Sequence, residues 1–209
     1  SLGSFFAFRI DSLMIPEFIS NEANGDFNIG VNLANTLMIP ATGVFALYSP
    51  IISEALKNND FNLLRKKYTE VAKNLFFIGI LMYGCVILGM REFIELLPTA
   101  QKLLPTLPVL YILGANVVLN MATGFNTEII AYSKHYRFNL IAILTLAILN
   151  VGINWFLLTN TNYGIVGVAY ASLFSMVVFN VIKLIFIYNK FQMIPINSSY
   201  FKTILLSFS

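Results

Sequence analysis

The sequence predicts an all-α, polytopic transmembrane helix bundle, and its composition and apolar patterning support this fold class. Of the 209 residues, 57% are hydrophobic and only 11% are charged, whereas a soluble domain carries about 25% charged residues. The apolar residues form continuous runs close to the length of about 20 that a helix needs to cross a bilayer. Membrane β-strands would instead show alternating segments of about 10 residues.

Six apolar runs predict spanning helices, at residues 2–19, 29–53, 71–90, 104–127, 138–158 and 165–189. We expect residues 1–197 to form one six-helix transmembrane lobe. A further apolar run begins near Tyr200, and residues 198–209 are expected to start a truncated seventh helix. The chain opens without Met and stops within this run, so we expect it to be part of a longer polytopic protein.

The loops between these runs alternate in charge. Three of them contain most of the basic residues: Lys57, Arg65, Lys66, Lys67 and Lys73; Lys134 and Arg137; Lys190 and Lys202. The other loops are poor in basic residues. Because basic loops stay on the cytoplasmic side, the first span is predicted to run from inside to outside.

Residues 54–73 are predicted to be an amphipathic cytoplasmic segment. Leu64, Tyr68, Val71 and Leu75 recur at helical spacing on one face, and Asp60 can cap the helix. We expect this segment to lie on the inner membrane face, with its basic residues near anionic headgroups.

Arg9 and Asp11 are charged residues within the first apolar run. Charges at bilayer depth cost about 3 kcal/mol or more and usually mark a cavity or a transport path. Residues two apart point to different sides of a helix, so they do not pair simply with each other. Either they line a cavity or one forms a salt bridge to another helix, and we favour the cavity.

Amide side chains recur on several predicted spans. Asn116 and Asn120 lie four residues apart, as do Asn150 and Asn154, while Asn32 and Asn35 lie three apart. Amides need partners in lipid, so these faces turn inward, where they join helices or line a wet cavity. The candidate substrate-binding residues are therefore Arg9, Asp11, Asn35, Asn116, Asn120, Asn150 and Asn154.

Pro40 and Pro50 lie in the second predicted span. Each removes a backbone donor and favours a kink, so both are hinge candidates, with Pro40 nearer the middle. Gly167, Ala171 and Ser175 form a small-residue face that predicts close helix packing.

The sequence lacks the patterns of an enzyme. His135 is the single histidine and Cys85 the single cysteine, and no metal, phosphate-loop or nucleophile motif is present. We expect no catalytic residue, no cofactor, no metal and no nucleic-acid partner.

Four stretches of the sequence together resemble one family of membrane proteins. They are FRIDSLMIPEFIS, NGDFNIGVNLANTLMIPATGVFALYSPIISEAL, NNDFNLLRKKYTEVAKN and LAILNVGINWFLLTNTNYGIVGVAYASLFSMVVFNVIKL. In this order they resemble the first helix, the next helix, the basic loop and the later helix pair in the second half of the polysaccharide flippases of the multidrug/oligosaccharidyl-lipid/polysaccharide exporter superfamily.

The resemblance implies two six-helix lobes around a V-shaped cavity, with this chain as the second lobe. It implies that the protein flips a lipid-linked oligosaccharide, carried on a polyprenyl diphosphate, across the bacterial cytoplasmic membrane by alternating access. Its partners would be that cargo, membrane lipids and the N-terminal lobe, and its process would be O-antigen, lipopolysaccharide or other surface polysaccharide assembly. The alternatives are an ion-coupled multidrug exporter of the same superfamily, a membrane-embedded envelope-sugar transferase or polymerase, and a scaffolding subunit.

Overall fold

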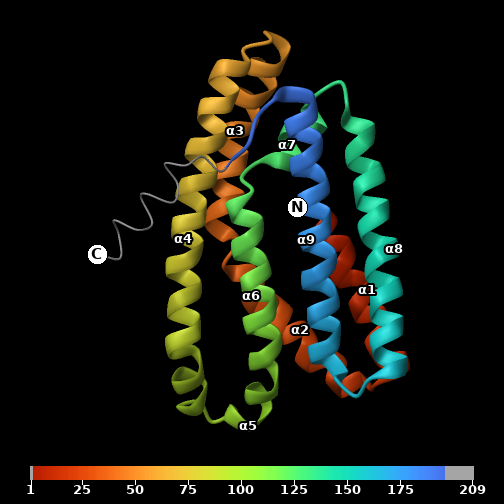
Figure 1. Cartoon of the computed structure of the whole chain (residues 1–209). Helices are drawn as coiled ribbons and strands as arrows, with labels where there is room; N and C mark the ends of the chain where they lie inside the picture. Colours follow the sequence, from red (N-terminus) through yellow and green to blue (C-terminus); the bar gives the residue numbers. More distant parts are fainter. Residues whose placement is uncertain (1, 196–209) are drawn as a thin grey trace.

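Helices account for almost all of the chain that the structure describes. The computed structural model describes the backbone of residues 2–195 and side chains from residue 10 onward, and it contains no strand in that range. The prediction of an all-α bundle is confirmed (Figure 1). The helices are α1 (Leu2–Phe18), α2 (Asn21–Thr36), α3 (Ile39–Lys57), α4 (Phe61–Glu95), α5 (Ala100–Leu103), a 3-10 turn (Leu104–Thr106), α6 (Leu107–Ala122), α7 (Asn126–Tyr132), α8 (Tyr136–Asn160) and α9 (Gly164–Phe191).

The helices form two layers. Helices α4, α6, α9 and α8 stand side by side at the front of Figure 1, and α3, α2 and α1 lie behind them. Helix α6 contacts α4, α2 and α9, while α8 packs against α9 and α1. Helices α1, α8 and α9 are therefore mutual neighbours, although α1 is far from the other two in the sequence.

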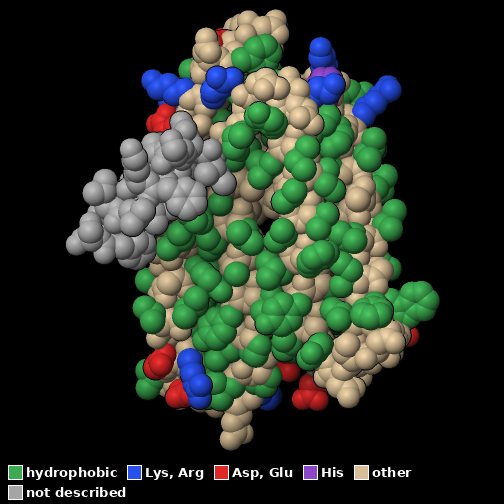
Figure 2. All heavy atoms as spheres, viewed as in Figure 1, with side chains coloured by type: hydrophobic (Ala, Val, Ile, Leu, Met, Phe, Trp, Pro, Cys, Tyr) green, Lys and Arg blue, Asp and Glu red, His purple; other side chains and the backbone are tan. Residues whose placement is uncertain are grey.

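The chain is a multi-pass membrane protein. Within the described residues, five helical segments are long and apolar enough to cross a membrane: Ile39–Lys57, Phe61–Glu95, Ala100–Ala122, Tyr136–Asn160 and Gly164–Phe191. Figure 2 shows a wide apolar surface with charged side chains at its two ends. We name the end that holds the α3–α4 turn, the α7–α8 turn and the end of α9 the basic end, because the basic loops of the sequence gather there.

Two predicted spans are interrupted in the structure. The span predicted at 29–53 is two helices, with α2 ending at Thr36 and α3 beginning at Ile39. Pro40 lies in the first turn of α3, where its missing N–H costs little, and Pro50 lies within the continuous α3 helix. The span predicted at 104–127 also ends early, because Gly124 adopts a left-handed conformation (φ +59°) after α6.

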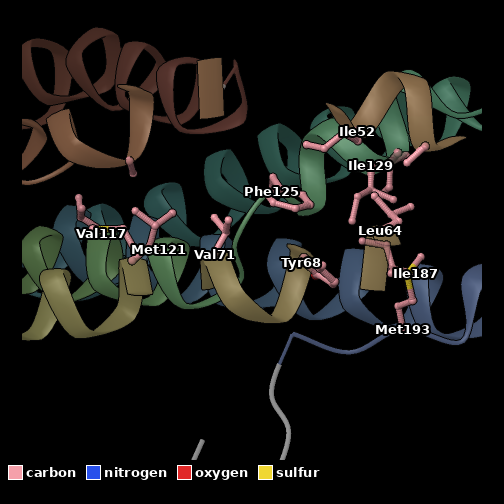
Figure 3. Packing of buried hydrophobic residues seen from close by; sticks show 14 of the residues in the cluster. Ile52, Leu64, Tyr68, Val71, Val117, Met121, Phe125, Ile129, Ile187 and Met193 are labelled. Atoms are coloured by element: carbon pink, nitrogen blue, oxygen red, sulfur yellow. The ribbon is translucent and has the colours of Figure 1, made fainter. Parts of the chain in front are cut away.

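The amphipathic segment is not a separate helix on the membrane surface. Residues from Phe61 onward form the first turns of α4, which continues unbroken to Glu95, and Asp60 accepts a hydrogen bond from the backbone N–H of Leu63 at 3.0 Å. Its apolar stripe packs inside the lobe: Figure 3 shows Tyr68 and Leu64 near side chains of the α6–α7 region. A stripe that finds a protein partner does not need a lipid surface, and this explains the difference from our expectation.

Candidate functional site

Four buried polar side chains form a closed hydrogen-bonded ring between α1, α8 and α9. The amide of Asn154 donates to Asp11 Oδ1 at 2.6 Å and to Asn150 Oδ1 at 2.5 Å. The amide of Asn150 donates to Ser172 Oγ at 3.0 Å, and the Ser172 hydroxyl donates to Asp11 Oδ2. We call Asp11, Asn150, Asn154 and Ser172 the polar ring.

The polar ring joins three helices in the interior of the lobe. Each of its members is at most 1% exposed. Asn150 and Asn154 lie one helical turn apart on α8, so both amides face the same side. Each of the four side chains thus has hydrogen-bond partners within the ring, as a polar side chain needs in a medium without water, and Asn154 Oδ1 is the one ring oxygen without a partner.

A second polar group lies at the junction of α6, α7 and α9. The amide of Asn126 donates to Asn180 Oδ1 at 3.1 Å. One helical turn further along α9, the fully buried Lys183 donates to the hydroxyl of Thr127 at 2.5 Å and lies 4.2 Å from the ring centre of Phe179. Within the described residues no carboxylate lies at ion-pair distance from Lys183, although the charge of Glu128 acts on it from further away.

Helix α2 carries a stripe of amides on its outer face. Phe27, Gly30, Val31 and Ala34 form the buried face of α2. The asparagines lie on an adjoining face at intervals of three or four residues, and none of them is buried: Asn21, Asn24, Asn28, Asn32 and Asn35. We name these five residues the amide face.

Contacts fix one end of the amide face and leave the other end open. The amide of Asn28 donates to the backbone carbonyl of Asn24 at 2.8 Å, and the hydroxyl of Ser12 donates to Asn28 Oδ1 at 2.9 Å. Asn32 and Asn35 are exposed, and no side chain of the described residues bonds to either amide. These two amides are therefore available to a ligand or to water.

The structure brings together only some of the residues that the sequence singled out. Asp11, Asn150 and Asn154 meet in the polar ring, closed off from solvent. Asn116 is buried on α6 with its Oδ1 unbonded, Asn120 is partly exposed and Asn35 is exposed on α2. The Arg9 side chain lies outside the described residues, as does the seventh helix predicted from residue 198.

Sequence reasoning missed several members of these groups. It placed a loop between the first two predicted spans, so the first three amides of α2 were not connected with Asn32 and Asn35. The signal was present: Ser20 caps α2 by accepting from the N–H of Ala23 at 3.1 Å, and the asparagine spacing continues from Asn21. Ser172 carried no signal in the sequence, because a single serine in an apolar helix is common.

Comparisons with protein-family models, with curated proteins and with solved structures give no match. Among the residues that the structure describes, no group of three or more His, Cys, Asp or Glu side chains is placed to hold a metal ion. The fold and the polar groups therefore define the class of the chain as a multi-pass helical membrane protein with a polar interior.

Proposed function

We propose that this chain is one lobe of a membrane transporter that flips a lipid-linked oligosaccharide between the leaflets of the bacterial cytoplasmic membrane. The observation that carries the proposal is the amide face of α2. Unbonded amides are costly against lipid, so a face with five asparagines is expected to meet water or another part of the protein. Neutral amides both donate and accept hydrogen bonds, which suits the hydroxyl groups of sugars.

The exposed surfaces of α8 and α9 differ from the amide face in composition. The exposed residues of α8 and α9 include Leu140, Ile148, Phe156, Phe174 and Ile185. Such apolar surfaces are compatible with lipid. An asymmetric lobe, apolar on one side and amide-rich on another, is expected when one side faces a shared aqueous cavity.

The break between α2 and α3 supports the proposal that α2 moves relative to α3. Helix α2 is separated from α3 at Leu37 and Met38, and Pro40 keeps the two from merging into one helix. Transporters use discontinuous helices near their binding sites. We propose that α2 changes its angle to α3 at this break during alternating access, while the polar ring keeps α1, α8 and α9 together.

The test is transport by the native protein that contains this chain, reconstituted into liposomes with a fluorescent lipid-linked oligosaccharide. Replacing Asn32 and Asn35 together by Ala removes two neutral hydrogen-bonding groups, each worth about 0.5–1.5 kcal/mol. The transport rate at low substrate concentration is expected to fall roughly tenfold, with a normal amount of folded protein. An unchanged rate would remove the amide face from the substrate path.

A threonine pair provides the matched control. Thr36 on α2 and Thr145 on α8 are both exposed, and each donates its hydroxyl to a carbonyl of its own helix. Cysteine at position 36 is expected to react with a water-soluble thiol reagent, and the label to block transport, whereas cysteine at position 145 stays unlabelled in lipid. Labelling of both positions, or of neither, would contradict the proposed cavity wall.

The transport assay also tests the alternative function. If the protein in the liposomes moves an apolar cation instead of the lipid-linked sugar, the drug-exporter alternative is favoured.

A further inference from the structure

A pocket of about 530 Å³ lies at the basic end of the lobe. Its walls come from four segments that are distant in the sequence: the end of α3, the start of α4, the turn between α7 and α8, and the end of α9. This pocket includes no residue of the polar ring or of the amide face, and it therefore requires an explanation of its own.

Four basic side chains line the pocket: Lys57, Lys134, His135 and Lys190. No Asp or Glu is among the lining residues. Within the part of the chain that the structure describes, the lysines of the pocket form no ion pair, since the ion pairs found there are Lys67–Glu70 and Arg91–Glu95. Several cations that share a concave wall without a counter-charge raise the local concentration of anions.

The imidazole of His135 is held in place beside these lysines. Its ring makes edge contacts with Phe186 and Phe191, with ring centres 5.5 and 6.1 Å apart, and its backbone N–H donates to Ser133 Oγ at 3.1 Å. Partial desolvation, followed by the charges of Lys134 and Lys190, lowers the pKa of His135 from its ordinary value. The charges of Lys134 and Lys190 thus make the field at His135 positive, and an anion bound beside it would oppose their effect.

The pocket also has an apolar wall. Phe61 and Phe191 line it with ring centres 6.0 Å apart, and Leu56 lies beside them. Free phosphate would use only the basic wall, whereas a lipid phosphate would use both walls. Basic pockets between transmembrane helices on one membrane face bind anionic lipid headgroups.

We propose that this pocket binds the phosphate group of an anionic membrane lipid, with Lys57, Lys134 and Lys190 around the phosphate and the first acyl carbons against Phe61 and Phe191. The site is separate from the proposed transport path, and it does not depend on the identity of the cargo. It would anchor the α3–α4 and α7–α8 turns to one leaflet of the membrane.

The test uses the native protein, delipidated in a neutral detergent and titrated with phosphatidylglycerol, with bound lipid counted by native mass spectrometry. Each lysine near a lipid phosphate contributes about fivefold in affinity. The triple variant Lys57→Gln, Lys134→Gln, Lys190→Gln is therefore expected to bind phosphatidylglycerol roughly 100-fold more weakly. If the triple variant does not fold, Lys134→Gln alone, on an exposed turn, is expected to weaken binding about fivefold.

A second triple variant separates the pocket from general charge. Lys66→Gln, Lys67→Gln and Arg137→Gln remove the same formal charge from side chains near the same end that do not line the pocket. This control is expected to bind phosphatidylglycerol within a factor of about three of the wild type, because exposed charges in solution are screened. Equal losses in the two triple variants would overturn the proposal.

Two further arms identify the ligand. Inorganic pyrophosphate is expected to compete only weakly with phosphatidylglycerol for the pocket, because it cannot contact the aromatic wall. If it binds as tightly as phosphatidylglycerol, the ligand is a soluble phosphate and the lipid assignment is overturned. Phosphatidylcholine, which has no net charge, is expected to bind far more weakly, and equal binding would also overturn the proposal.

A spectroscopic measurement reports on the pocket directly. The protein is prepared with isotope-labelled histidine, and the nuclear magnetic resonance signal of the His135 imidazole is identified by its loss in a His135→Gln variant. Its pKa is expected to rise when phosphatidylglycerol is added, because a nearby anion favours the charged imidazolium. A pKa that does not change while the lipid binds would place the lipid elsewhere and overturn the proposal.

Discussion

Ser172 and Ser175 offer a comparison that isolates the energy of the polar ring. Both serines lie on α9, one turn apart, and both are at most 1% exposed. Ser172 donates to Asp11 and accepts from Asn150 at 3.0 Å, whereas the hydroxyl of Ser175 has no hydrogen-bond partner. Replacement by Ala removes the same atom in each case, but only Ser172→Ala breaks bonds.

The expected magnitudes follow from the number of bonds lost. Hydrogen bonds between membrane helices contribute about 0.6 kcal/mol on average and up to about 1.7 kcal/mol. Ser172→Ala removes two bonds, one of them to a carboxyl group, and is expected to lower the free energy of unfolding by about 1–3 kcal/mol. Ser175→Ala is expected to leave it unchanged or to raise it, because no bond is lost and a buried hydroxyl without a partner is removed.

The assay is reversible unfolding in mixed micelles with increasing sodium dodecyl sulfate, followed by far-ultraviolet circular dichroism. Wild type and both variants are measured at the same lipid composition. Equal losses of stability in the two variants would refute the reasoning, since the effect would then come from packing around a serine rather than from the ring.

Two other predictions concern packing and topology. Gly30→Ala is expected to cost about 1–3 kcal/mol of unfolding free energy by overpacking, because its new Cβ would lie 2.8 Å from the Val109 Cβ. Gly43→Ala meets no atom within 4 Å and is expected to be neutral or stabilising in the same unfolding assay; equal costs would contradict the close approach of α2 to α6. For topology, an impermeant thiol reagent applied outside intact cells is expected to label Asn160→Cys and not Lys134→Cys, in a background without the native cysteine. Labelling of position 134 alone would show that the chain crosses the membrane in the opposite orientation.

The fold class and most helix positions follow from the sequence alone. The predicted spans at 71–90, 138–158 and 165–189 lie within α4, α8 and α9. These predictions succeeded because a membrane helix satisfies its own backbone hydrogen bonds, so that its length and apolar character are local properties. The spacing of Asn150 and Asn154 likewise indicated an inward face before any partner was known.

The packing of the helices against one another determines where they break and what the polar residues contact. The N-terminal half of α2 is rich in asparagine, which favours loops over helices, and it forms a helix that packs closely against α6. The partners of Asp11 are 143 and 161 residues away in the sequence, and the basic pocket combines four distant segments. Such groups depend on which helices become neighbours, and periodicity within one helix carries no information about that choice.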